Sequence, residues 1–364
     1  MTRATTLAAL LVFALVPRPA RAEEKIVRVY NWADYIADDT LSGFEKATGI
    51  KVVYETFTSN EEVQEKLVAG QGGYDVVIPS SMWGKQQAAE GLLRPIEKSR
   101  VTNLRNLDPQ LQGRLARLDP GNRYLVPWLW GFTTVGIDVA RVKKALGGLP
   151  MPENAWDLLF KKAYVSRLRS CGVSVLDSPT ELVPMVLHYL GRPPHSGAIE
   201  DYAGVQQLLL EIRPYVTRFG VDYIDDLAAG KVCLVLGYSG DINVAKRRAR
   251  ERKTGRDIQA LLPSTGAVLF VDTMAIPKKA PHPENAHRFI DYVLRPEVHA
   301  GLTNKIFYAN PNASSMPFVN PEVAREPTVF PPPAELDRMV MPDVLSDEAR
   351  RLMSRIFAKF KAGR

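Results

Sequence analysis

The sequence contains few of the residues on which catalytic and metal sites are usually built. It has only five histidines, in no spacing typical of a metal site, and it lacks both a Gly-x-Ser-x-Gly elbow and a glycine-rich phosphate loop after a strand. His282 and His287 could form a metal pair, but Pro283 between them favours the start of a surface helix. We therefore expect no enzyme, no bound metal and no cofactor.

The chain also lacks an apolar run long enough to cross a membrane. The longest one, Leu7 to Val16, has about ten residues, whereas a membrane anchor needs ~20. Arg3 precedes this run, and the small-residue pattern Ala20-Arg21-Ala22 follows it. This is the pattern of a secretory signal peptide, so we expect residues 1–22 to be cleaved off and the mature chain to be exported to the periplasm. No cysteine lies near the cleavage point, which argues against a lipid anchor.

Cysteine is nearly absent, since Cys171 and Cys233 are the only two. In an oxidising compartment two thiols favour a structural disulfide, and a metal site would need more ligands. The bridge would close a loop of about sixty residues and contribute on the order of 3 to 4 kcal/mol. The alternative is a pair of buried free thiols.

A strong excess of one charge is missing as well. Without the signal-peptide residues Arg3, Arg18 and Arg21, the formal net charge falls from +7 to +4. The one dense basic run, Lys246 to Lys253, could be a phosphate-binding patch, but we interpret it as the solvated face of a helix. Export and the modest net charge both argue against nucleic acid as a partner.

What the sequence does contain is an alternation of strand and helix patterns. The first three strand-like segments are Ile26 to Tyr30, Lys51 to Tyr54 and Asp75 to Ile78. Between them, a helical pattern over Thr40 to Thr48 ends at Gly49, and Ser59 with Glu62 forms a capping box that opens a second helix. Repeated β–α units predict an α/β fold with a parallel, doubly wound sheet.

The 364 residues are enough for two such domains. Strand patterns at Ser174 to Leu176 and Val232 to Leu236 predict the second lobe. Two segments without helical period, Tyr124 to Ile137 and Val268 to Ile276, are interpreted as extended crossovers between the lobes. The expected division is residues 23–133 plus 262–308 for the first lobe and 134–261 plus 309–364 for the second.

Acidic and aromatic side chains follow several of the predicted strands. Trp32, Asp34 and Tyr35 come after the first strand, Ser80 after the third, and Tyr238 and Asp241 after the late strand of the second lobe. In open α/β sheets ligands bind beyond the carboxyl ends of the strands. Ring faces attract cations and carboxylates accept the N–H donors of an ammonium, so this combination indicates a site for an organic amine. Each residue alone has a simpler reading, as a core ring or as a helix cap.

The chain resembles the periplasmic putrescine- and spermidine-binding receptors of bacterial ABC importers over essentially its whole mature length. The matching segments are Tyr30 to Ile36, Phe44 to Lys46 with Gly49 to Tyr54, Cys171 to Ser174, and Phe307 to Asn310. The resemblance implies the two-lobed, type II-like periplasmic binding fold, in which two doubly wound lobes close on a ligand. It also implies a membrane ABC permease as partner and supports the Cys171–Cys233 bridge, and we expect a monomer.

The resemblance further implies roles for individual residues. Asp241 and Asp272 would bind one ammonium, Asp34 would face the other, and Glu181 would act near it through water. Ser80 would donate or accept a hydrogen bond, and the methylene chain would lie against the rings of Trp32, Tyr238, Phe270 and Tyr308.

Three positions depart from the putrescine-type pattern. Ala33 stands where those receptors carry Ser, Tyr238 where they carry Trp, and Met82-Trp83 where they carry Ser-Phe. The preferred amine is therefore open, with putrescine first, then spermidine, agmatine or cadaverine. The alternatives are a receptor for another small cation or an amino acid, and an amine-sensing protein that signals to a membrane receptor.

Overall fold

The computed structural model describes residues 24–220 and 222–363. The predicted signal peptide lies outside the described residues. The strands are β1 (Ile26–Trp32), β2 (Lys51–Phe57), β3 (Val76–Val77), β4 (Leu93–Arg94), β5 (Val126–Asp138), β6 (Val173–Val175), β7 (Arg218–Phe219), β8 (Leu234–Tyr238), β9 (Ile258–Ala260), β10 (Leu269–Met274) and β11 (Ile276–Pro277).

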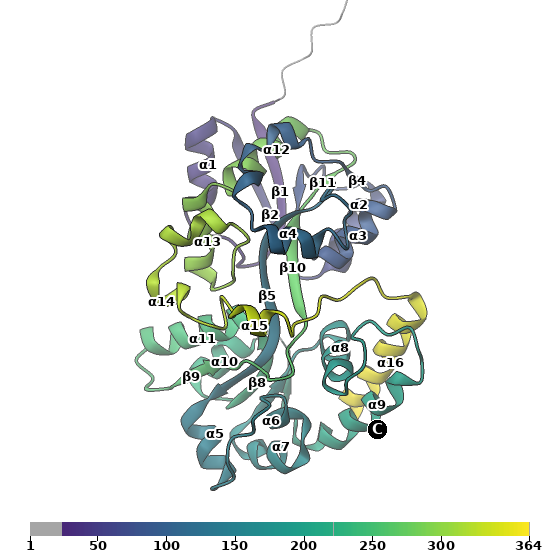
Figure 1. Cartoon of the computed structure of the whole chain (residues 1–364), viewed down its shortest axis with the longest axis vertical. Helices are drawn as coiled ribbons and strands as arrows, with labels where there is room; N and C mark the ends of the chain where they lie inside the picture. The colour runs from purple at the N-terminus through teal and green to yellow at the C-terminus, as the bar shows by residue number, and fades with distance from the viewer. Residues whose placement is uncertain (1–23, 221, 364) are drawn as a thin grey trace, which may run out of the picture.

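Helices cover the sheets of both lobes (Figure 1). The α-helices are α1 (Thr40–Thr48), α2 (Asn60–Ala69), α3 (Ser81–Ala89), α4 (Pro109–Leu115), α5 (Val139–Leu146), α6 (Asp157–Phe160), α7 (Lys162–Leu168), α8 (Pro179–Tyr189), α9 (Asp201–Ile212), α10 (Tyr223–Ala229), α11 (Ser239–Glu251), α12 (Pro283–Val293), α13 (Pro296–Ile306), α14 (Pro321–Ala324), α15 (Pro333–Leu336) and α16 (Asp347–Ala362). The 3₁₀ turns are η1 (Lys98–Arg100), η2 (Thr102–Asn106), η3 (Arg169–Cys171), η4 (Arg213–Tyr215) and η5 (Ala313–Phe318).

The first lobe is built on the parallel sheet that the β–α pattern predicts. Its order is β2-β1-β3, and β1 pairs in parallel with both neighbours. α1 ends at Gly49 in the left-handed conformation, and the Ser59 side chain accepts a hydrogen bond from Glu62 N at 3.3 Å at the start of α2. The Glu62 carboxylate accepts in turn from Thr58 N, one residue before the cap.

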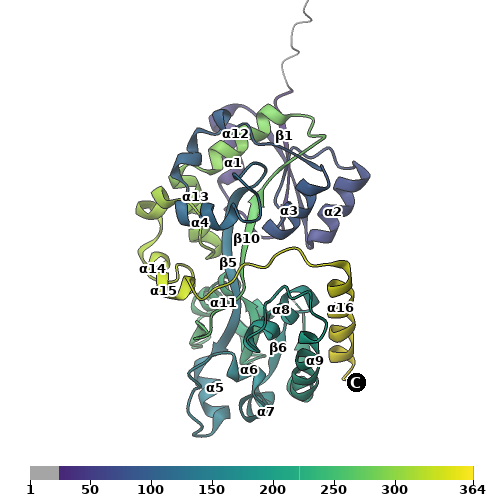
Figure 2. The ribbon, with the colours of Figure 1, turned by 45° about the vertical axis from the view of Figure 1, so that its right-hand side comes forward.

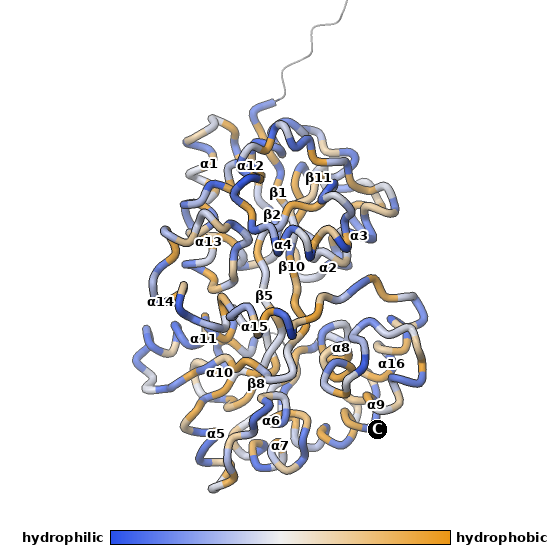
Figure 3. The backbone as a smooth tube through the Cα atoms, viewed as in Figure 1, coloured by the Kyte–Doolittle hydropathy of each residue, from blue (hydrophilic) through white to orange (hydrophobic). Residues whose placement is uncertain are grey.

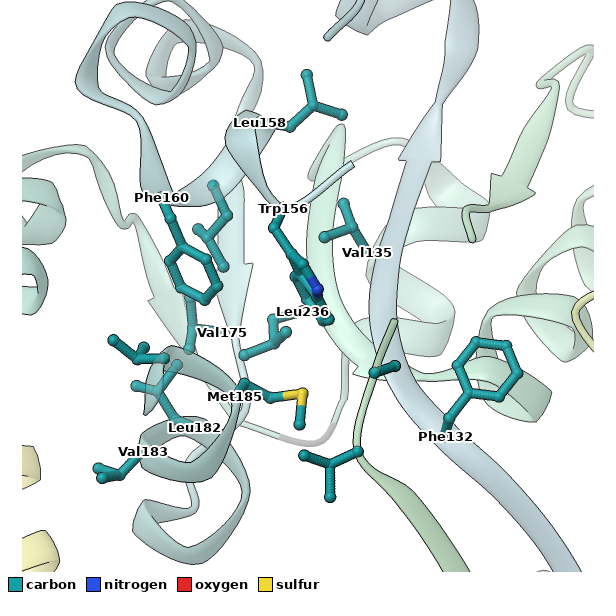
Figure 4. Close-up of a cluster of buried hydrophobic side chains, with 14 of the residues drawn as sticks. Phe132, Val135, Trp156, Leu158, Phe160, Val175, Leu182, Val183, Met185 and Leu236 are labelled. Atoms are coloured by element: carbon teal, nitrogen blue, oxygen red, sulfur yellow. The ribbon is translucent and has the colours of Figure 1, made fainter. Parts of the chain in front are cut away.

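The second lobe contains the parallel strands β6, β7 and β8, and β5 adds to β8 antiparallel. Its core is large, and Figure 4 shows Trp156 and Met185 among the aliphatic side chains that fill it. The Trp156 indole N–H donates to Gly266 O at 2.9 Å, so its one polar atom is satisfied inside the core. In Figure 3 hydrophobic and hydrophilic residues alternate along the surface helices, as expected for helices that bury one face.

β5 and β10 run between the two lobes, which confirms the two predicted crossovers (Figure 1). All thirteen residues of β5 are buried. β10 pairs antiparallel with β5 on one side and reaches the first lobe through Thr273 N to Pro79 O (2.9 Å) and Ala275 N to Val77 O (2.9 Å). The register shifts between Asp272 and Thr273, at the level where the two lobes meet. The two-lobed α/β fold is thus the one predicted.

The predicted disulfide is confirmed. Cys171, in η3, is bonded to Cys233, just before β8, with Cα atoms 5.5 Å apart and a sequence separation of 62. The bridge ties the entry of β6 to the entry of β8 inside the second lobe, and β8 carries the site residue Tyr238 at its far end.

The C-terminal part of the chain touches both lobes. η5 contacts α13 and η2 of the first lobe, whereas α16 packs on α8 and α9 of the second. Figure 2 shows the segment between α15 and α16 running across the space between the lobes. The lobe boundaries given above stay a prediction.

The basic run Lys246 to Lys253 lies on α11 and just after it. Lys246 is paired with Glu326 at 2.9 Å and Arg248 with Asp225 at 3.1 Å. Because acidic neighbours already compensate part of this charge, the run fits the solvated helix face that we expected from the sequence.

Candidate ligand-binding site

The candidate site lies where the two lobes meet the crossovers. Asp272 belongs to β10, Glu181 to the first turn of α8, and Asp241 to the first turn of α11. Ser80 caps α3 of the first lobe. Hydrogen bonds and ring contacts link most of the residues named from the sequence into one connected group.

Asp272 is the most deeply buried acid of the group, with a residue exposure of 5%. Its Oδ1 accepts a hydrogen bond from Ser80 Oγ at 2.8 Å. Burial raises the pKa of Asp272 to about 6, against the opposing effects of the bond from Ser80 and of the nearby Tyr35 hydroxyl. The carboxylate is therefore held in place but incompletely solvated.

Asn60 fixes Ser80, and sequence reasoning missed it. Its Oδ1 accepts from Ser80 N at 3.0 Å and its Nδ2 donates to Ser80 Oγ at 3.2 Å. Asn60 is the first residue of α2, next to the helix cap Ser59. It does not directly follow a predicted strand, so its position in the sequence does not indicate a site residue. Its role depends on the packing of α2 against α3, which no local pattern reveals.

Asp241 is oriented by two tyrosines. The hydroxyls of Tyr223 and Tyr308 donate to its two oxygens, each at 2.6 Å. Burial raises the pKa of Asp241, the two tyrosine bonds and the charge of Arg248 lower it, and the charge of Asp34 raises it. Tyr223 was not identified from the sequence, because it lies on α10, 18 residues before its partner.

Gly240 is required next to this carboxylate. A Cβ at this position would lie 2.5 Å from the Tyr308 ring. The ring can therefore reach Asp241 only because residue 240 has no side chain.

Glu181 comes from the second lobe and lies close enough to Asp272 for their charges to interact. Its Oε2 accepts from Thr133 Oγ1 at 3.0 Å, and Thr133 belongs to the crossover β5. Burial raises the pKa of Glu181 to about 7, opposed by the bond from Thr133 and reinforced by the charge of Asp272. The charged form of Glu181 is therefore disfavoured in the empty site.

Asp34 is the exposed member of the group. It has φ 55°, in the left-handed region that Asp tolerates better than most residues. The preceding Asn31 shapes this turn, since its side chain accepts from Trp32 N at 2.8 Å and donates to Tyr35 O at 3.2 Å. The charge of Asp34 raises the pKa of the Asp241 carboxyl, so the two acids lie close enough to interact electrostatically.

Aromatic rings form a continuous wall beside these acids. Tyr35 packs edge-on against Tyr308 with ring centroids 5.3 Å apart, and Phe270 links Tyr308 (5.8 Å) to Tyr238 (5.4 Å). Trp32 packs against Phe57 at 4.6 Å. The indole nitrogen of Trp32 and the hydroxyl of Tyr35 are buried without a hydrogen-bond partner of normal geometry, which leaves two polar atoms unsatisfied at the site.

A cavity between the lobes adjoins this group. It is lined from the first lobe by Asn60, Ser80 and Trp83, from the second by Glu181 and Pro184, and from the crossover by Phe270. Ser80, Glu181 and Phe270 are shared with the acidic group, so the cavity and the acids form one region.

The charge of the site is unbalanced. Among the ion pairs of residues 24–220 and 222–363, none joins a Lys or Arg to Asp241, Asp272 or Glu181. The part of the chain that the structure describes contains no group of three or more metal-ligating side chains and no helix long and apolar enough to cross a membrane. An acidic, ring-lined and largely dehydrated site of this kind is complementary to an organic cation.

The raised carboxyl pKa values predict how stability depends on pH. Because the folded-state pKa of Glu181 and Asp272 exceeds the unfolded value, the ligand-free protein binds extra protons near pH 4 to 7 and loses stability as the pH rises through that window. The side chain in Glu181→Gln cannot titrate. The free energy of unfolding of this variant, relative to wild type, should therefore be roughly 1 to 3 kcal/mol higher at pH 8 than at pH 5. Urea unfolding at both pH values, with the exposed Glu153→Gln as control, measures this. An equal difference at the two pH values would contradict it.

Comparison with known proteins places the chain in a family. The profile of the family described as bacterial extracellular solute-binding protein matches residues 40–331. The chain is 40% identical over 345 residues to the "Putrescine-binding periplasmic protein PotF" of Escherichia coli (strain K12), covering 94% of this chain and 93% of that protein. It is also 40% identical over 361 residues to the "Putrescine-binding periplasmic protein SpuD" of Pseudomonas aeruginosa (strain UCBPP-PA14), covering 99% and 98%.

Solved structures show the same fold. The spermidine/putrescine ABC transporter substrate-binding protein PotD of Streptococcus pneumoniae superposes with a TM-score of 0.80 at 24% identity, covering 93% of this chain and 99% of that one. The TpPotD lipoprotein of Treponema pallidum superposes with a TM-score of 0.79 at 22% identity, covering 93% and 99%. The chain belongs to the bacterial extracellular solute-binding proteins.

Proposed function

We propose that this protein is a periplasmic receptor that captures a small aliphatic polyamine between its lobes and delivers it to an ABC importer. The observation that carries the proposal is the cluster of Asp241, Asp272 and Glu181, which is dehydrated, walled by aromatic rings and paired with no Lys or Arg. The two relatives named above are putrescine-binding proteins by name, which supports putrescine as the first candidate. Spermidine, agmatine and cadaverine follow.

The proposed roles of the residues follow from their chemistry. Asp241 and Asp272 would accept the N–H donors of one ammonium, and Asp34 would face the other, with Glu181 acting near it through water. Trp32, Tyr238, Phe270 and Tyr308 would pack on the methylenes, and each ring facing an ammonium would add about 0.5 to 2 kcal/mol. The unpaired Trp32 and Tyr35 polar atoms would be satisfied by ligand or by water held with it.

Lobe closure would couple binding to transport. The acids come from the first lobe (Asp34), the second lobe (Glu181, Asp241) and the crossover (Asp272). A ligand that contacts all of them binds the closed arrangement better than an open one and therefore shifts the population toward it. We propose that the importer recognises this closed form, and that the receptor acts as a monomer and releases its ligand unchanged.

The first test is a thermal-shift panel on the mature protein. Putrescine at about 100 times its Kd should stabilise the folded state by about 3 kcal/mol, which corresponds to a Tm increase of roughly 4 °C for a chain of this length. Spermidine, agmatine and cadaverine complete the panel, and free amino acids serve as controls. If none of the four amines raises Tm, the polyamine proposal is wrong, and a response to amino acids alone would indicate a different class of receptor.

An uptake assay in cells distinguishes delivery of the amine to an importer from sensing of the amine. Deletion of the gene should abolish uptake of the bound amine if the receptor serves an importer, whereas unchanged uptake would favour signalling to a membrane receptor.

A further inference from the structure

A further carboxylate lines the cavity outside the acidic cluster. Asp343 lies in the segment between α15 and α16, and it lines the cavity together with Trp83, Glu181 and His195. The Asp343 side chain is 41% exposed. It therefore stands at the rim of the cavity, which Asp241 does not line.

Asp343 is already paired with a cation of the protein. Lys85 Nζ, on α3 of the first lobe, lies 2.6 Å from Asp343 Oδ1. Partial burial acts to raise the pKa of Asp343, but the bonds from Lys85 and from Val344 N outweigh it and lower the pKa. The carboxylate is thus ionised and neutralised by an ammonium group that belongs to the chain itself.

The segment that carries Asp343 is fixed on both sides. Val340 exchanges backbone hydrogen bonds with the start of the crossover, from Val340 N to Ala267 O (3.0 Å) and from Leu269 N to Val340 O (2.8 Å). Farther along, Arg350 donates to Gln86 Oε1 at 3.1 Å. Figure 2 shows this segment crossing between the lobes, so Lys85 and Asp343 meet at a defined place rather than on a free tail.

We propose that the Lys85–Asp343 pair limits the length of the bound amine and makes this receptor select diamines over triamines. The inference rests on the proposed polyamine function. A ligand seated at the acidic cluster with a longer chain would extend past Glu181 and Phe270 into this cavity, where its extra ammonium needs a carboxylate. Among the described residues that line the cavity, Asp343 is the one acid besides Glu181. The Lys85 ammonium already pairs with Asp343, and it repels a second cation placed beside it.

The rival explanation is that the pair only holds the lobes together. It joins α3 of the first lobe to the segment that leads into α16 of the second, so its loss could weaken closure for every ligand alike. The two explanations predict different values for the ratio of the dissociation constants of a triamine and a diamine. A role in selection changes this ratio, whereas an effect on lobe closure alone cancels in it.

The test is titration calorimetry of wild type, Lys85→Gln, Asp343→Asn and the double variant with putrescine and spermidine. Wild type should prefer putrescine. Lys85→Gln frees Asp343 and should lower the ratio of the spermidine Kd to the putrescine Kd by about tenfold or more. Asp343→Asn leaves Lys85 uncompensated and should raise that ratio. The double variant should fall between them. Lys46→Gln, an exposed lysine on α1, is the matched control and should change neither constant.

Two results would overturn the inference while leaving the proposed function intact. One is an equal loss of affinity for both amines in Lys85→Gln and Asp343→Asn, which would show a lobe contact without a role in selection. The other is a wild-type protein that binds spermidine more tightly than putrescine. If wild type binds neither amine, the proposed function itself fails, and that outcome is distinct from both.

Discussion

Replacing Asp272 by asparagine is expected to weaken putrescine binding by about 100-fold or more. Removing one partner of a buried, hydrogen-bonded charge pair costs about 3 to 5 kcal/mol, since the ammonium would be left dehydrated and uncompensated. Asp272 is 5% exposed, and no basic group among the described residues pairs with it, so no neighbour there can take over its charge. Isothermal titration calorimetry with putrescine measures the change directly.

The same variant should fold normally without ligand. The raised pKa of Asp272 means that its ionised form costs stability in the empty protein, and the substitution removes that cost. The Tm of ligand-free Asp272→Asn should therefore stay within a few degrees of wild type or rise. Asp241→Asn tests the tyrosine-held Asp of the site in the same way, and the exposed Asp257→Asn is the matched control. Wild-type affinity in both buried-site variants would reject the site assignment.

Removing the disulfide should have the largest effect on stability. The loop closed by the bridge, whose ends are 62 positions apart in sequence, corresponds to about 3 to 4 kcal/mol of loop-closure entropy in the unfolded chain. Cys171→Ser with Cys233→Ser should therefore lower Tm by roughly 5 °C. Scanning calorimetry of the double variant measures this, and the reduced wild-type protein should melt at a similar temperature.

Ligand affinity should change much less than stability in that variant. The bridge lies at the entries of β6 and β8, whereas Tyr238 and Asp241 lie at and beyond the far end of β8. A small change in Tm would contradict the assigned role of the bridge. A large loss of affinity measured well below the Tm would show instead that the bridge positions the site.

Much of the fold could be predicted because its signals are local. Gly49 and Gly70 end α1 and α2 in the left-handed conformation, and Ser59 caps α2, each within one helical turn of the residues it affects. The long apolar segments at Tyr124 to Ile137 and Val268 to Ile276 revealed the crossovers, since only strands buried on both faces tolerate such runs. The strand-end rule likewise found Asp34, Ser80 and Asp241.

The supporting partners of these residues could not be found in this way. Asn60, Tyr223 and Thr133 hold Ser80, Asp241 and Glu181 by hydrogen bonds that span 20, 18 and 48 residues. A Tyr on a helix or a Thr on a strand carries no sign of which distant carboxylate it will face. The same holds for Lys85 and Asp343, which are separated by 258 residues.

The sequence alone therefore determined the two α/β lobes, their crossovers, the disulfide and the residue types of the site, because backbone conformation and burial follow from short-range patterns. The tertiary structure alone decided which side chains share the dehydrated space between the lobes, and with it the raised carboxyl pKa values and the pairing at the cavity rim. Desolvation and charge interaction depend on distance in space, and chain packing sets that distance between residues that are remote in sequence.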